Sequence, residues 1–129
     1  MRKFISILLL AFVSSNAMAE LVKVGESNSL IEYAYPDTIR RSDHEVKIWL
    51  LLDYKAQQPT VGRKPFLSEK MQDEYDCNEE QSRGLAITVY SGNMGSGNVI
   101  FSDAYLSDWK PVTPDSLDET TLKYACGNK

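Results

Sequence analysis

Apolar and polar side chains alternate along the middle of the chain with the two-residue period of a β-strand. In residues 45–55, one side of this pattern carries only apolar or aromatic residues, namely Val46, Ile48, Leu50, Leu52 and Tyr54. The other side is mixed and contains Lys47, Trp49, Leu51, Asp53 and Lys55. This segment is therefore predicted to be a long strand that buries one face.

Five further segments are predicted strands: residues 21–25, 30–35, 66–77, 83–91 and 98–103. Segment 66–77 is less regular, because Glu69 and Asp73 share a side with its apolar residues, so a bulge or a half-exposed strand is expected there. Turn-forming residues separate the strands at 35–37, 58–62 and 92–97. This spacing predicts an antiparallel sheet of about six strands joined by hairpins.

A single helix is expected after the sheet. Prolines keep residues 109–116 extended. Ser116 followed by Glu119 is a capping box, and the helical spacing of residues 117–126 stops at Gly127. The predicted fold class is therefore α+β, an antiparallel sheet of about six strands with a C-terminal helix.

Residues 1–19 have the layout of a secretory signal peptide. A positively charged end precedes an unbroken apolar run over residues 4–13, and Ala17-Met18-Ala19 fits a signal-peptidase site. The run is shorter than the roughly 20 apolar residues that a membrane-spanning helix needs. Cleavage is expected before Glu20, which leaves residues 20–129 as a single domain outside the cytoplasm.

Composition and cysteine content narrow the function classes. The formal net charge of the chain is −4, and loss of the two positive charges of the leader makes the mature domain more acidic, at −6. An acidic domain argues against binding to nucleic acids or anionic membrane surfaces. Outside the cytoplasm, the cysteine pair Cys77 and Cys126 most simply forms a disulfide that pins the helix to the sheet. Two free thiols or an intermolecular bridge are the alternatives.

Several short motifs follow one another along the mature chain. They are Val46 to Tyr54 (VKIWLLLDY), Ser68-Glu69-Lys70, Glu74 to Cys77, Arg83, Tyr90-Ser91, Gly97, Trp109 to Ser116 (WKPVTPDS) and Cys126. Their order and spacing, over residues 22–126, resemble the surface-adhesin protein E family of bacterial exported proteins.

The resemblance implies a sheet of about six strands with a C-terminal helix, tied by one disulfide at Cys77 and Cys126. It also implies a binding role, because the best-known family member is an outer-membrane lipoprotein adhesin that binds vitronectin, laminin and plasminogen and can form a homodimer. This chain lacks the cysteine of a bacterial lipid anchor, since its first mature residue is Glu20. We therefore expect an unlipidated protein in the periplasm, at the cell surface or secreted.

Few residues suggest a catalytic, metal-binding or phosphate-binding role. His44, the only histidine, lies in a polar stretch and is expected to be a turn residue, not a catalytic base. Carboxylates crowd around Cys77, namely Asp73, Glu74, Asp76, Glu79 and Glu80. They could bind a cation, but calcium-loop spacing is missing, so a solvated strand end and turn is favoured. Segment 92–97 is interpreted as a hairpin loop, because a strand and not a phosphate-binding helix follows it.

Three residues are candidates for partner binding: Trp49, Lys47 and Lys129. If the helix packs on the mixed side of the long strand, Trp49 belongs to the core, which is the favoured interpretation; if that side is open, Trp49 is an anchor for a partner. Trp109 is expected to pack against the proline segment. Lys129 ends the chain, and kringle domains of plasminogen recognise C-terminal lysines, although a frayed end is the simpler interpretation.

The sequence thus favours an exported, non-catalytic binding protein without a cofactor or a metal ion. The family resemblance implies that its partner is a host extracellular-matrix or plasma protein. The alternative is a periplasmic structural or assembly factor that associates with itself or with an envelope partner. An enzyme is not expected, since the sequence shows neither a nucleophile–base pair, nor metal-ligand spacing, nor a cofactor motif.

Overall fold

The computed structural model describes residues 20–60 and 63–127, so the predicted signal peptide and Lys129 lie outside the described residues. The strands are β1 (Val22–Glu26), β2 (Leu30–Ser42), β3 (Glu45–Thr60), β4 (Arg63–Asp76), β5 (Gln81–Tyr90), β6 (Val99–Ala104) and β7 (Lys110–Pro111). The helices are the short 3-10 helix η1 (Asn93–Gly95) and the α-helix α1 (Leu117–Cys126).

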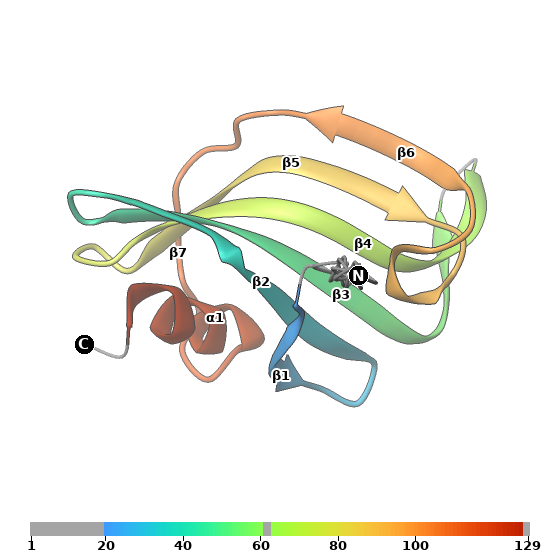
Figure 1. The fold of residues 1–129 in the computed structure, drawn as a ribbon, viewed down its shortest axis with the longest axis horizontal. Coiled ribbons are helices and arrows are strands. Elements are labelled where there is room, and N and C mark those ends of the chain that lie inside the picture. The colour runs from blue at the N-terminus through green and yellow to red at the C-terminus, as the bar shows by residue number, and fades with distance from the viewer. Residues whose placement is uncertain (1–19, 61–62, 128–129) are drawn as a thin grey trace, which may run out of the picture.

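The strands form one antiparallel sheet in which β1 to β6 follow one another in chain order. The two-residue strand β7 pairs with the beginning of β5. Figure 1 shows this meander, with helix α1 lying against one end of it. The predicted architecture, an antiparallel sheet of about six strands with one C-terminal helix, is confirmed.

The turn predicted at residues 35–37 is wrong, because β2 continues through it as a bulge. The pairing of β2 with β3 shifts after Tyr35, which lies opposite Trp49. Pro36 has no amide hydrogen, and a bulge is one of the few places where a sheet accepts proline. The Thr38 hydroxyl donates to the Tyr35 carbonyl at 2.6 Å and accepts from the Trp49 amide at 3.0 Å, which satisfies the backbone across the bulge.

Two other irregular places are predicted in the sheet, one in a turn and one within a strand. Of the turn predicted at residues 58–62, residues 58–60 belong to β3, whose last residue Thr60 pairs with Arg63. Residues 61–62 lie outside the described residues. The bulge expected in segment 66–77 lies instead in the partner strand, since β5 has one extra residue, Leu85, where it pairs with Gln72 and Asp73 of β4. The other expectation for this segment, a half-exposed strand, fits residues 69–73, which are half-buried.

Helix α1 packs on one side of the sheet and forms the core with it. The buried apolar side chains of this core are Ala34, Val46, Ile48, Leu50, Tyr75, Leu122 and Ala125. They include alternate residues of β3, as its apolar side predicted. Each large aliphatic side chain that is fully buried contributes about 1.5–3 kcal/mol, so this interface holds the helix in place.

Both ends of α1 are capped at the predicted residues. Ser116 Oγ accepts a hydrogen bond from the Glu119 amide at 3.1 Å, and Gly127 ends the helix in the left-handed conformation, with φ 79°. The Glu119 carboxylate pairs with Lys123 Nζ at 3.2 Å, so the structure shows the Ser116 half of the capping box.

A disulfide joins Cys77 and Cys126, with an S–S distance of 2.05 Å and Cα atoms 5.8 Å apart. Cys77 directly follows β4, and Cys126 is the last residue of α1. The predicted intramolecular bridge is therefore present. It fastens the C-terminal end of a ten-residue helix that would be marginal on its own.

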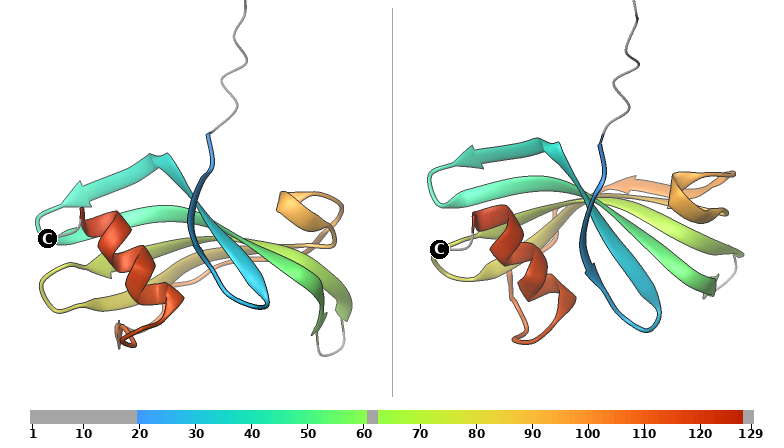
Figure 2. Two further views of the ribbon diagram at one scale, coloured as in Figure 1. Left: turned by 90° about the horizontal axis from the view of Figure 1, so that it is seen from below. Right: turned by 60° about the horizontal axis from the view of Figure 1, so that its bottom comes forward.

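The side of the sheet away from α1 is termed the outer face. One end of it is covered by residues 92–97, which form the predicted hairpin connection between β5 and β6 and contain η1. Ser68 Oγ donates to the Gly92 carbonyl at 2.6 Å and accepts from the Gly95 amide at 2.9 Å. Figure 2 shows α1 and η1 at opposite ends of the sheet, so the part of the outer face behind α1 is left open by both helices.

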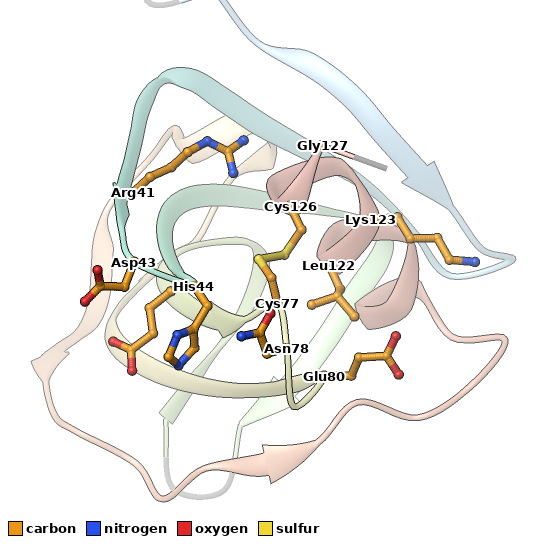
Figure 3. A pocket seen from close by; sticks show the side chains of 11 residues that line it. Arg41, Asp43, His44, Cys77, Asn78, Glu80, Leu122, Lys123, Cys126 and Gly127 are labelled. Atoms are coloured by element: carbon orange, nitrogen blue, oxygen red, sulfur yellow. A yellow bond between two sulfur atoms is a disulfide. The ribbon is translucent and has the colours of Figure 1, made fainter. Parts of the chain in front are cut away.

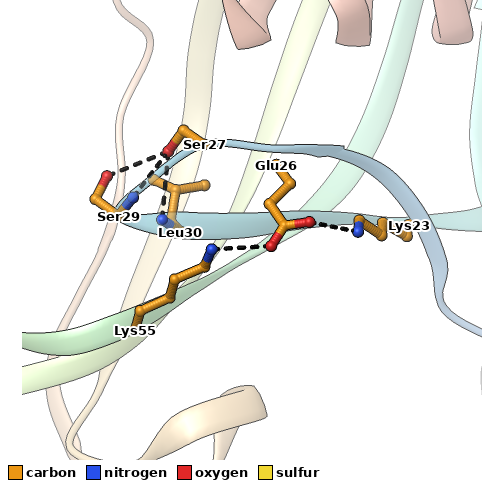
Figure 4. Close-up of polar contacts among 6 residues, drawn as sticks. All are labelled: Lys23, Glu26, Ser27, Ser29, Leu30 and Lys55. Atoms are coloured by element: carbon orange, nitrogen blue, oxygen red, sulfur yellow. Dashed lines mark hydrogen bonds and ion pairs between the residues drawn. The ribbon is translucent and has the colours of Figure 1, made fainter.

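Polar contacts hold the β1–β2 hairpin to β3 (Figure 4). The Glu26 carboxylate pairs with Lys23 Nζ at 2.6 Å and with Lys55 Nζ at 2.9 Å. Hydrogen bonds from these two lysines lower the pKa of Glu26 to about 2. In the turn, Ser27 Oγ accepts a hydrogen bond from the Leu30 amide at 3.3 Å. The edge strand β1 is thereby fixed beside the helix.

Candidate functional site

Side chains of the outer face form a cationic and aromatic group. Lys70 on β4 places its Nζ 4.7 Å from the centre of the Tyr35 ring and 5.6 Å from the centre of the Trp49 ring. Tyr35 and Trp49 lie opposite one another in the β2–β3 ladder. A cation over an aromatic ring contributes about 0.5–1 kcal/mol at an exposed site. We term Tyr35, Lys47, Trp49 and Lys70 the outer patch.

Trp49 does not belong to the core beneath the helix, so the favoured sequence interpretation is wrong. The core side of β3 carries Val46 and Ile48, and Trp49 lies on the other side because strand residues alternate. Its side chain is half-buried, and Lys47 on the same side of the strand is exposed. The structure thus places Trp49 on the side of the sheet that α1 leaves open, and its role as an anchor for a partner stays a prediction.

A second cation–aromatic contact involves Arg83 on β5. Its guanidinium carbon lies 4.3 Å from the centre of the Trp109 ring, and its Nε donates to Glu74 Oε1 at 2.7 Å. Glu74 is buried, so the arginine supplies the partner that a buried carboxylate requires. Trp109 thus has an arginine as a ring partner, while its packing against the proline segment stays a prediction.

The carboxylates around Cys77 have separate environments. Glu74 and Asp76 are buried, so the prediction of a solvated strand end is wrong for both. Glu74 is paired with arginine as described above, and Asp76 Oδ1 accepts hydrogen bonds from the amides of residues 78 and 79 at 3.0 Å each. The exposed members of the group are Glu79 and Glu80.

His44 lies in the β2–β3 turn, as predicted, with its Nε2 atom 3.6 Å from Asp76 Oδ2. Within the described chain, His44, Glu45 and Asp76 are the group of side chains that could hold a metal ion. A cavity of about 500 Å³ lies beside them, between this turn and the end of α1. Figure 3 shows His44 on one wall of this cavity and the Cys77–Cys126 disulfide on another.

Acidic groups lie where α1 meets the sheet, and one of them, Glu32, is buried. The Tyr75 hydroxyl donates to Asp118 Oδ1 at 2.8 Å, and the Thr121 hydroxyl donates to Glu32 Oε1 at 3.0 Å. Burial raises the pKa of Glu32 to about 7 and that of Asp73 to about 7, and the Asp118 charge adds to both shifts. The helix closes over these carboxyl groups, so they affect its attachment to the sheet.

Comparison with known proteins identifies the family. The family model described as surface-adhesin protein E matches residues 21–127. The chain belongs to the surface-adhesin protein E family. Membership implies an exported or cell-surface protein with an adhesin-like binding role. In residues 20–60 and 63–127, the structure shows no helix with the length and apolar character required to cross a membrane.

Solved structures of Haemophilus influenzae protein E have a similar fold. Crystal form II is 14% identical, with a TM-score of 0.56, and the match covers 83% of this chain and 97% of that chain. The selenomethionine form is 13% identical, with a TM-score of 0.57 and coverage of 86% and 96%. Protein E from a non-typeable strain is 12% identical, with a TM-score of 0.56 and coverage of 88% and 80%. No sequence among the curated proteins matches this chain.

Sequence reasoning identified Lys47 and Trp49 but missed Tyr35 and Lys70, the other two members of the outer patch. Tyr35 precedes a proline, so it falls at the end of the predicted strand 30–35 and at the start of the predicted turn 35–37. Lys70 lies in the least regular of the predicted strands. The alternation of side chains along a strand could have identified Lys70. Its neighbour Met71 packs against the core, so Lys70 points to the other side of the sheet, where Trp49 lies.

Proposed function

We propose that this protein is an exported, non-catalytic adhesin-like protein that binds a protein partner through the outer patch. Membership in the adhesin family supports the binding role. The position of Lys70 over Tyr35 and Trp49, on a part of the sheet surface that α1 leaves open, supports the outer patch as the binding site. Tyrosine and tryptophan are enriched among the residues that dominate binding energy at protein interfaces.

The charge of the outer patch suggests which partners fit it. Lys47 and Lys70 place positive charge on this surface, although the chain as a whole is acidic. Such a patch favours an acidic segment of the partner, because complementary charge speeds association and fixes the register of the complex. By family resemblance, the candidate partners are vitronectin, laminin and plasminogen.

Surface plasmon resonance with the three host proteins tests this function. The protein comprising residues 20–129, with its disulfide formed, is expected to give saturable binding to at least one of them. Flat responses across vitronectin, laminin and plasminogen would exclude the host-adhesin version. A second measurement uses a variant that lacks Lys129. If plasminogen is captured through a C-terminal lysine, this deletion abolishes the plasminogen response and leaves the responses to vitronectin and laminin unchanged.

A second candidate function is a periplasmic structural or assembly factor, and the edge strand β6 favours it. This strand is the last of the sheet. One of its edges pairs with β5, and the described chain places no strand against the other edge. Val99 is 58% exposed and Leu106, just beyond the strand, is 67% exposed. An open edge with apolar side chains favours pairing with another strand, from a second copy in a homodimer or from an envelope partner.

Protease treatment of intact cells separates the two functions. An adhesin is accessible from outside and is digested, whereas a periplasmic factor is digested only after the outer membrane has been permeabilised. Protection in intact cells would exclude the adhesin role while leaving the assembly role standing.

A further inference from the structure

We infer that His44, Glu45 and Asp76 form a binding site for a divalent transition-metal ion, and that zinc is the ion that their donor atoms favour. The three side chains come from the β2–β3 turn, the start of β3 and the end of β4. Each offers one ligand atom, and these atoms all lie within 4.8 Å of one another. This site is independent of the proposed binding role of the outer patch.

The sheet itself brings the two carboxylates together. Glu45 and Asp76 lie directly opposite one another in the β3–β4 ladder. Two like charges in this arrangement destabilise a sheet. A cation held between them would turn this repulsion into attraction, so the register of the two strands favours a bound ion.

The distance between His44 and Asp76 fits two ligands of one ion. Nε2 and Oδ2 are 3.6 Å apart, which is longer than a direct hydrogen bond of about 2.7–3.2 Å. Zinc binds nitrogen and oxygen at about 2.0–2.2 Å in tetrahedral geometry, so two of its ligand atoms lie roughly 3.3 Å apart. For this pair, a small movement of the imidazole is enough to reach that spacing.

Asp76 is held ready to act as a ligand. The residue is 8% exposed, and the backbone amides of residues 78 and 79 donate to its Oδ1 atom. These bonds orient the carboxylate so that Oδ2 faces the imidazole. Support of a ligating carboxylate by hydrogen bonds is typical of metal sites.

The surroundings leave room for the remaining ligands of the ion. The His44 side chain is 47% exposed and can turn, and His44 and Glu45 both line the cavity of about 500 Å³ shown in Figure 3. Water can therefore complete the coordination from the cavity side. Both cysteines are joined in the disulfide, so thiolates take no part.

The donor set selects the class of metal. One imidazole nitrogen and two carboxylate oxygens suit zinc and neighbouring transition metals. Calcium takes six to eight oxygen ligands, and magnesium requires near-octahedral oxygen coordination. Two carboxylates and an imidazole provide neither the many oxygen ligands of calcium nor the octahedral oxygen ligands of magnesium.

The test is zinc titration of tag-free, chelator-treated protein comprising residues 20–129. Calorimetry is expected to give one zinc ion per chain, unaffected by an excess of calcium or magnesium. Because the chain has one histidine, its imidazole nitrogen resonances are unambiguous in NMR, and Nε2 is expected to shift as zinc is added. Absence of zinc binding, or an imidazole signal that zinc leaves unchanged, would overturn the proposal.

Single substitutions locate the ion. His44→Gln and Glu45→Gln are each expected to weaken zinc binding at least about tenfold, since even outer-sphere changes cost 10–100-fold at metal sites. Asp76→Asn keeps the acceptor for the two turn amides and is expected to weaken binding similarly. The matched control is Asp43→Asn, which removes a neighbouring exposed carboxylate outside the group and is expected to leave the affinity unchanged. If His44→Gln binds zinc as tightly as the natural chain, or if Asp43→Asn weakens binding as much, the assignment is wrong.

Discussion

The hydroxyl of Thr121, in the middle of α1, donates to Glu32 Oε1 on β2 at 3.0 Å, and both residues are buried. At the N-terminal end of the helix, Asp118 accepts hydrogen bonds from Tyr75 and Ser82, at 2.8 and 3.0 Å. The disulfide fastens the other end. The helix is therefore attached to the sheet at three levels, two of which depend on carboxyl groups.

The buried carboxyl groups predict that stability falls as the pH rises from about 4 to about 7. In the folded state Glu32 and Asp73 have pKa values of about 7, whereas their ordinary values are 4.5 and 3.8. Between these limits the folded state binds more protons than the unfolded state, so the free energy of unfolding decreases with pH. Thermal denaturation followed by circular dichroism is expected to give a higher melting temperature at pH 5 than at pH 8.

The substitution Glu32→Gln isolates this effect. Glutamine keeps an acceptor for Thr121 and carries no charge, so the variant is expected to be more stable than the natural protein at pH 8, by on the order of 2 kcal/mol. The advantage should be much smaller at pH 5 and disappear near pH 4. Glu79→Gln, in the exposed turn after Cys77, is the control. It should leave the free energy of unfolding unchanged at both high and low pH. A variant that is less stable at both pH values would contradict the account of Glu32.

The disulfide is expected to contribute a large part of the stability. Its cysteines are separated by 49 positions, and for a loop of this size the chain-entropy estimate is about 4 kcal/mol. Urea denaturation of the double variant Cys77→Ser/Cys126→Ser should therefore show a loss of this size. The natural protein under reducing conditions is the control and should approach the variant. A loss below about 1 kcal/mol would show that the helix is held without the bridge.

The N-cap of α1 gives a smaller and more local prediction. Ser116→Ala removes the acceptor of the Glu119 amide and should lower the free energy of unfolding by about 1 kcal/mol. Ser116→Asp keeps an acceptor at the same place and should retain most of the stability. Chemical denaturation of the two variants measures the difference, and equal losses would mean that the cap is unimportant.

Much of the fold follows from short-range patterns in the sequence. The alternation around Ile48 predicted which side of β3 is buried, and Ser116 and Gly127 predicted where the helix begins and ends. Pro36 led to the wrong prediction of a turn at residues 35–37, because proline usually marks a turn. A bulge becomes visible only from the pairing with the neighbouring strand. The hydroxyl of Thr38, which satisfies the Trp49 amide there, has no signature in the sequence.

The site was harder to predict than the fold, because it depends on which side of the sheet the helix covers. Alternation separates Trp49 from Ile48, but it cannot say which side receives α1. The contact of Lys70 with Tyr35 further requires the register of three strands. The metal site depends on pairing in the same way, since Glu45 and Asp76 are 31 positions apart in the chain and meet only across the β3–β4 ladder.

Binding through the outer patch is tested most directly by two lysine variants that remove the same charge from opposite sides of the molecule. Lys70→Ala removes the ammonium group over Tyr35, whereas Lys123→Ala removes one from the exposed surface of α1. Equilibrium binding to whichever host protein the natural chain captures is expected to weaken at least about tenfold for Lys70→Ala, the loss of a contributing interface residue. The affinity of Lys123→Ala should be unchanged. Equal affinities for Lys70→Ala and the natural chain, or a loss confined to Lys123→Ala, would contradict the assignment of the outer patch.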